Sequence, residues 1–329
     1  MHNVMRNKVR LSALGDRDID RLTRAIVVIL VIGIPLIAFL YWSDRHVDRQ
    51  PSLADRSIAA AEELVRKSPN DLGARISLAA SYVSAGRYEE GVAQFGEVIK
   101  TESGNRAALL GRGIAYTELE KYDLAKADFQ AMVDGAKGGE FAATDPQLER
   151  AYYELGVVAL KQSLPNEALD PLKAALAIDS ADADALYSYG MALIATGDPT
   201  LGVKALKRAV AFVPSGWCEP YLGLVDGYGA LGNTPGVAYA NGMVDFCSAR
   251  YTDATQKLEP LTSGPMSIDA LLGLALVSAY SGDLPGATSY YQRVLEVEPG
   301  NVSAQIGLGQ IGGGAHATAP AASPTAGSN

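Results

Sequence analysis

Histidine is the side chain best suited to acid–base catalysis and metal binding near neutral pH. The three histidines of the chain are His2, His46 and His316, so residues 47–315 contain none. No phosphate-binding loop and no HExxH, CxxC or GxSxG motif stands in a suitable context. The sequence therefore predicts a protein that is not an enzyme and has no catalytic residues, no metal site and no cofactor.

Neighbouring carboxylates are a second group that could act as a general acid and base. Asp182 and Asp184 flank the start of a predicted helix, where a carboxylate caps free backbone N–H groups. Glu89 and Glu90 fall on a predicted solvent-facing helix surface. We therefore interpret both pairs as structural.

Cys218 and Cys247 are the only cysteines of the chain. They lie near the outer ends of two predicted consecutive helices, 217–231 and 235–249. In an antiparallel hairpin, residues equidistant from the turn face each other, so the two cysteines are expected to lie opposite one another at its open end. Neighbouring helices pack about 8–10 Å apart, and Cα atoms within about 7 Å would allow a disulfide. Two unpaired buried thiols are the alternative.

Residues 25–42 form a run of eighteen residues without a charge. At about 1.5 Å rise per residue, a helix of this length is roughly 27 Å long, close to the thickness of the hydrocarbon core of a bilayer. Tyr41 and Trp42 stand at its end, where amphipathic rings favour the headgroup region. We expect a transmembrane helix over this run rather than a cleaved signal peptide or a buried core helix.

Basic residues set the expected orientation of this helix. Residues 1–24 hold six Lys and Arg, whereas Arg45, Arg49 and Arg56 are the nearby basic residues that follow it. The bias predicts a single-pass cytoplasmic (inner) membrane protein, with residues 1–24 cytoplasmic, a linker over 43–52 and the remainder extracytoplasmic. The net charge of −9 disfavours nucleic acid as a partner.

A period of 34 residues relates several segments after this helix: Phe95 is followed by Phe129, and Gly156 by Gly190. Within each segment, apolar residues recur every three or four positions, which indicates two amphipathic helices. Glycine marks the turn between the two helices, and proline marks the end of the second. The sequence thus predicts a stack of helix pairs.

This pattern resembles the tetratricopeptide repeat (TPR) family over about residues 53–311. The resemblance implies an all-α fold, a solenoid of antiparallel helix pairs wound into a right-handed superhelix, preceded here by the transmembrane helix. The expected unit starts are Leu72, Arg106, Glu149, Ala183, Pro235 and Ile268.

Several segments depart from the regular repeat. Residues 135–145 read as an insertion, and 217–231 as an extra helix before the unit at Pro235. Residues 302–311 are expected to form a capping helix. The stretch 312–329 is rich in Gly, Ala, Pro and Ser, which predicts a disordered tail.

In this family, defined positions of the first helix of each pair line a concave groove. The residues at these positions are apolar, aromatic or Met: Ile76, Val83, Leu110, Ile114, Tyr153, Val157, Leu160, Tyr187, Met191, Ile194, Tyr239, Met243 and Phe246. Family members that clamp a peptide's terminal carboxylate use Lys, Asn and Arg there. Because none occurs at these positions, the resemblance implies no carboxylate-clamp chaperone peptide. The groove instead suits an amphipathic or apolar protein segment, unless neighbouring helices bury it.

We therefore expect a membrane-anchored scaffold that mediates protein–protein interactions and recruits or positions partners in an envelope assembly process. The alternative within the binding class is an assembly chaperone, such as a factor that presents apocytochromes in cytochrome c maturation. A ligand-sensing or enzymatic domain is less favoured, since the insertion offers only Lys137, Glu140 and Asp145 as titratable groups.

Overall fold

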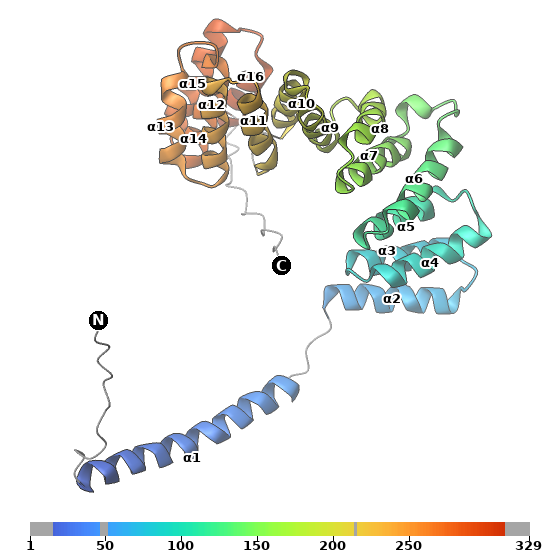
Figure 1. The fold of residues 1–329 in the computed structure, drawn as a ribbon, viewed down its shortest axis with the longest axis vertical. Helices are drawn as coiled ribbons and strands as arrows, with labels where there is room; N and C mark the ends of the chain where they lie inside the picture. The colour runs from blue at the N-terminus through green and yellow to red at the C-terminus, as the bar shows by residue number, and fades with distance from the viewer. Residues whose placement is uncertain (1–15, 47–51, 214–215, 313–329) are drawn as a thin grey trace, which may run out of the picture. The chain divides into compact units, whose positions relative to one another are not determined.

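The computed structural model describes residues 16–46, 52–213 and 216–312, and within these ranges the regular elements are helices, with no strand (Figure 1). The chain divides into two compact units, Met1–Arg56 and Ser57–Asn329. Of the segments predicted from the sequence, most of the basic segment 1–24, half of the linker 43–52 and nearly all of the tail 312–329 lie outside the described residues.

The first unit contains α1 (Asp16–His46), which includes Pro35. The apolar side chains that the structure describes on α1, such as Ile29 and Ile37 (each 68% exposed), are open to solvent. Among the described residues, no helix combines the length and the apolar character needed to cross a membrane. Membrane crossing by residues 25–42 therefore stays a prediction.

The remaining helices follow one another at short intervals. They are α2 (Leu53–Lys67), α3 (Leu72–Ser84), α4 (Tyr88–Thr101), α5 (Arg106–Glu118), α6 (Tyr122–Ala136), α7 (Pro146–Lys161), α8 (Pro165–Ile178), α9 (Ala183–Ala195), α10 (Pro199–Phe212), α11 (Glu219–Ala230), α12 (Thr234–Cys247), α13 (Tyr251–Leu258), α14 (Ser267–Ser281), α15 (Leu284–Val297) and α16 (Val302–Gly312). Short 3₁₀ helices, Ala142–Thr144 and Glu259–Leu261, follow α6 and α13.

The starts of several helices are set by their capping residues. The side chains of Asp71, Asn105 and Asp145 accept hydrogen bonds from backbone N–H groups in the first turns of α3, α5 and α7. Asp182 Oδ1 accepts from the N–H of Ala185 at 2.9 Å, which confirms its capping role at α9. These bonds satisfy donors that a helix otherwise leaves without partners.

Consecutive helices pack as pairs, and equivalent helices also contact each other one pair further along (Figure 1). α3 contacts α5, α5 contacts α7, α7 contacts α9, and α9 contacts α11. After α11, the next contact of this kind joins α12 to α14. We call the helices that make these contacts the inner layer. The inner layer therefore changes from odd-numbered to even-numbered helices at α12.

Glycine contacts show that α11, which occupies most of the predicted extra helix 217–231, forms a regular pair with α12. A Cβ atom at Gly236 of α12 would lie 2.5 Å from the ring of Tyr228 on α11. Gly91 of α4 makes the same close approach to Val83 of α3, eight positions earlier in the chain. The pair α11–α12 thus repeats the packing of α3–α4.

α12 also acts as the first helix of the next pair. Gly242 of α12 closely approaches Leu258 of α13, as Gly190 of α9 approaches Leu206 of α10. In both cases the contacting residues are sixteen positions apart in the chain. α12 is therefore shared between two helix pairs.

Candidate partner-binding face and pocket

The predicted groove positions on α3, α5, α7 and α9 lie where a partner could touch them. These ten residues are Ile76, Val83, Leu110, Ile114, Tyr153, Val157, Leu160, Tyr187, Met191 and Ile194. All ten are half-buried. All except Val157 also pack against a core cluster. They form an apolar strip, called here the inner strip, whose side chains are partly used by the core and partly open to solvent.

The three predicted groove residues on α12 are placed differently. Tyr239, Met243 and Phe246 are only 6%, 1% and 4% exposed. The ring of Phe246 packs on Tyr251 and Tyr280, with centroid distances of 6.2 and 5.3 Å. The open groove predicted for these three positions is therefore wrong, because the shared helix α12 is covered by its neighbours on several sides.

Tyr239 and Met243 instead line a pocket of about 320 Å³ near the C-terminal end of the solenoid. Six helices, α10, α11, α12, α14, α15 and α16, contribute to it. Most of its walls are apolar or aromatic, formed by Val210, Phe212, Tyr221, Tyr239, Met243, Leu272, Leu276, Tyr291 and Ile306. Phe212 and Ile306 are more than half exposed, so they form the rim rather than the floor.

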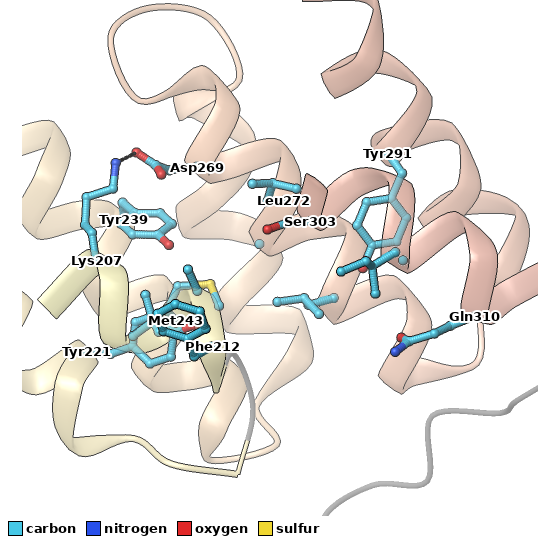
Figure 2. A pocket seen from close by; sticks show the side chains of 16 residues that line it. Lys207, Phe212, Tyr221, Tyr239, Met243, Asp269, Leu272, Tyr291, Ser303 and Gln310 are labelled. Carbon is cyan, nitrogen blue, oxygen red and sulfur yellow. Dashed lines mark hydrogen bonds and ion pairs between the residues drawn. The ribbon is translucent and has the colours of Figure 1, made fainter. Parts of the chain in front are cut away.

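Polar groups stand at two places around this pocket, as Figure 2 shows. Lys207 Nζ on α10 lies 2.8 Å from Asp269 Oδ2 on α14, so these two charges neutralise each other. Ser303 and Gln310 come from α16. Burial, with Asp269 nearby, raises the pKa of Tyr239, whose phenol stays uncharged at neutral pH. The pocket thus favours an uncharged, apolar group.

No local sequence signal points to this pocket, because its lining residues run from Lys207 to Gln310 and meet only after the shift of the inner layer at α12. The glycines of α12 also gave no warning from the sequence, because their close contacts to Tyr228 and Leu258 appear only in the folded chain.

Beside Tyr153 of the inner strip, α7 carries polar groups that serve the fold. Arg150 stacks over the ring of Tyr153 at 5.0 Å and pairs with the buried carboxylate of Glu154. Burial raises the pKa of Tyr153 to about 12. Because Arg150 is already paired, it offers no free charge to a partner's carboxylate.

The two cysteines are free, half-buried thiols on the packed helix pair α11–α12, and Cys218 is near enough to raise the pKa of Cys247, second to the effect of burial. In the part of the chain that the structure describes, no group of three or more His, Cys, Asp or Glu side chains is arranged to hold a metal ion. His2 and His316 lie outside the described residues.

Several solved structures are similar to this chain. YrrB, described as a TPR protein with an unusual peptide-binding site, is 20% identical with a TM-score of 0.47, covering 61% of this chain and 98% of its own. PilW, described as a type IV pilus biogenesis factor, is 18% identical with a TM-score of 0.45, covering 73% and 99%. MamA from Desulfovibrio magneticus RS-1 is 22% identical with a TM-score of 0.48, covering 55% and 97%.

Sequence comparison gives further relatives and a family. Cellulose synthase operon protein C of Escherichia coli (strain K12) is 26% identical over 192 residues, which cover 54% of this chain. The chain spans only 16% of the length of that relative. Residues 76–143 and 153–216 match the model of the tetratricopeptide repeat family. The chain therefore carries tetratricopeptide repeats, within an all-helical, TPR-like solenoid.

Proposed function

We propose that this protein is a membrane-anchored scaffold that holds a protein partner on the inner strip and in the pocket beside α12. Tetratricopeptide proteins bind protein or peptide partners, and this chain carries such repeats. The half-buried inner strip supplies apolar contact surface along α3 to α9. An apolar patch that stays open to solvent commonly marks an interaction site.

The pocket is the observation that carries this proposal. A partner is held mainly by a few anchor side chains that fill well-packed pockets. This pocket is bordered by exposed Phe212 and Ile306, and the one cation among its described lining residues, Lys207, is bound to Asp269. The fitting anchor is an uncharged apolar or aromatic side chain rather than a terminal carboxylate.

Membrane attachment is part of the same proposal. The support for it is the uncharged run of residues 25–42 and the exposure of its apolar side chains on α1. With more Lys and Arg before this run than after it, the repeats would lie outside the cytoplasmic membrane. Such a protein would position partners in an assembly process at the cell envelope. A role in assembly is also compatible with a relative named for a cellulose synthase operon.

Site-specific photo-crosslinking tests the proposal. A benzophenone side chain placed at Phe212, on the rim of the pocket, should give defined crosslinked products in cells. The matched control is Leu124 on α6, which is similarly exposed (49% against 53%) but lies outside both the pocket and the inner strip. Each product is identified by mass spectrometry, purified and tested for binding to the isolated protein.

A second variant ties the crosslink to the pocket. Leu272 lines the pocket from α14 and is only partly buried, so Leu272→Trp should fill the space with little effect on the fold. Crosslinking from Phe212 should fall at least tenfold in this variant while circular dichroism stays unchanged. Equal crosslinking from Phe212 and Leu124, or no effect of Leu272→Trp, would contradict the proposal.

A further inference from the structure

Cys218 and Cys247 lie together at the open end of the α11–α12 hairpin. Cys218 is the residue before α11, and Cys247 is the last residue of α12. Both are half-buried, α11 packs against α12, and Cys218 is near enough to act on the pKa of Cys247. Tyr221, one turn into α11, is close enough to interact with both sulfur atoms. Two neighbouring thiols at the ends of two helices form a ready-made pair for oxidation.

Cys247 also packs against the core cluster around α12, whereas Cys218 has no evident structural task. Cys218 stands at the N-cap position of α11, yet its side chain makes no capping hydrogen bond. Burial, together with the proximity of Cys218, raises the pKa of Cys247, so this thiol stays protonated and resists reaction on its own. Cys247 is therefore expected to react mainly with the neighbouring sulfur of Cys218.

We propose that Cys218 and Cys247 form a reversible disulfide that fastens α11 to α12. The oxidant is a disulfide, either of a small thiol or of a dithiol oxidoreductase. Cys218 attacks one sulfur of this disulfide and releases one thiol. Cys247 then attacks the Cys218 sulfur and releases the second thiol. The two protons pass to the released thiols, and the two electrons lost by the cysteines reduce the oxidant.

The bond would fasten two helices that both contribute to the pocket. Tyr221 on α11 and Tyr239 and Met243 on α12 line it. The glycine turn at Gly232 already closes the other end of this hairpin. A disulfide at the open end would therefore fix both ends of the pocket wall. This inference does not depend on the identity or existence of a partner.

Mass spectrometry of the full chain provides the direct test. The purified protein is equilibrated in mixtures of reduced and oxidised glutathione, quenched with acid, and its intact mass and peptides are measured. The expected product is a monomer lighter by two hydrogen atoms, with the peptides of Cys218 and Cys247 joined. Two free thiols at all glutathione ratios, a persistent glutathione adduct, or a disulfide between two copies would each overturn the proposal.

Denaturant unfolding supplies an independent measurement. A bond that closes a loop of roughly 30 residues should lower the unfolding equilibrium constant by about 450-fold in the chain-entropy model. Adding reductant should remove this stabilisation from the wild type. Cys218→Ser and Cys247→Ser are the matched controls, in which reductant should change nothing. If either serine variant fails to fold, comparing the oxidised with the reduced wild type still tests the disulfide. Equal stability of these two forms would refute it.

Discussion

The carboxyl group of Glu149 on α7 lies beside that of Asp182, the residue that caps α9. Glu149 is only 8% exposed, and among the described residues no donor reaches its Oε1 atom. Burial, followed by the charge of Asp182, raises the pKa of Glu149 to about 7. At the preceding junction, Arg106 of α5 forms a 2.7 Å ion pair with Asp145, which caps α7. One junction is thus ionic and the next holds two carboxyl groups.

The stability of the solenoid should depend on pH through Glu149. Its pKa in the folded state, about 7, lies above the ordinary value of 4.5. The contribution of the protonated Glu149 to the free energy of unfolding is therefore complete below pH 4.5 and is lost as the pH rises through 7. Glu149→Gln replaces the carboxyl group with an amide of similar shape that stays uncharged at every pH. The variant should raise the free energy of unfolding by about 2 kcal/mol at pH 8 and by almost nothing at pH 4.

Urea unfolding followed by circular dichroism at the two pH values measures this difference. Glu90→Gln is the control, because the Arg87 guanidinium lowers the pKa of Glu90 and the charged form is the favoured one. Glu90→Gln should therefore give no stabilisation at pH 8. If Glu149→Gln changes the free energy of unfolding equally at both pH values, the pKa of Glu149 is not raised in the folded protein.

The buried ion pair between α5 and α6 should matter more than exposed pairs. Arg112 donates two hydrogen bonds to Asp128, at 2.8 and 2.7 Å, and Asp128 is only 5% exposed. Asp128→Ala leaves the partly buried guanidinium without its partner and should cost about 3 kcal/mol of unfolding free energy. The exposed pair Lys126–Glu167 is the control, and Glu167→Ala should cost less than about 1 kcal/mol. Similar losses in both variants, measured by urea unfolding, would contradict this ranking.

The parts of the fold that follow from local signals could be predicted from the sequence. α3, α5 and α9 begin at Leu72, Arg106 and Ala183, each of which directly follows an Asp or Asn whose side chain caps the helix. α7 begins at Pro146, three residues before the expected Glu149, because Asp145 provides an earlier cap and proline suits the first turn of a helix.

The pocket and the burial of Phe246 could not be predicted in this way, because they depend on how α12 is shared. Gly236 and Gly242 allow close packing on two sides of α12, toward Tyr228 of α11 and Leu258 of α13. A repeat pattern assigns each helix to a single pair. The pattern therefore cannot show that one helix serves two pairs, nor that α14 then comes to lie beside Lys207 of α10.

Three turns between paired helices are strained because a residue other than glycine adopts a left-handed conformation there. Gly86 adopts φ +74° in the turn after α3, and Glu120, 34 positions later, adopts φ +56° in the equivalent turn after α5. Ser163 and Ala249 are likewise left-handed. A side chain in this left-handed conformation destabilises the folded state by about 1–2 kcal/mol. Glycine avoids this cost, but part of the gain is lost because glycine makes the unfolded chain more flexible.

Glu120→Gly should therefore raise the free energy of unfolding by about 0.5–1 kcal/mol, whereas glycine substitutions usually destabilise. The reverse change in the equivalent turn, Gly86→Ala, should lower it by about 1 kcal/mol although its Cβ would meet nothing within 4 Å. Thermal unfolding of the two variants beside the wild type checks both signs. A loss of stability in Glu120→Gly would show that the turn is not strained.

Helix glycines should differ according to what faces them. A Cβ atom at Gly156 of α7 would lie 2.4 Å from Leu172 of α8, which is fully buried. Gly156→Ala should therefore cost about 1–3 kcal/mol by overpacking. Gly135 of α6 has nothing within 4 Å, so Gly135→Ala should stabilise the protein by about 0.5–1 kcal/mol. Urea unfolding of both variants tests the pair, and a stable Gly156→Ala protein would mean that α7 and α8 can separate at no cost.

The proposed anchor predicts where the protein fractionates. Ile29 and Ile32 on α1 are 68% and 62% exposed. Replacing both with Asp should cost about 2.5–3.5 kcal/mol per residue in a membrane helix and move the protein from the membrane fraction to the soluble fraction. The control is Leu124→Asp, an equally polar change on α6, which should leave the protein with the membranes. Carbonate extraction followed by immunoblotting measures both.

The orientation of the anchor can be tested separately with protease and intact spheroplasts. Six basic residues precede residues 25–42 and three follow nearby, which favours retention of the N-terminus in the cytoplasm. Protease added outside should therefore digest the repeats, while an epitope tag placed before Met1 survives on a short membrane-bound fragment. A cytoplasmic protein probed on the same blot shows that the membrane stayed closed. If the tag is lost and the repeats survive, the charge bias has been overridden and the repeats face the cytoplasm. Their partners would then be cytoplasmic, and the Cys218–Cys247 bond would meet a reducing environment that disfavours it.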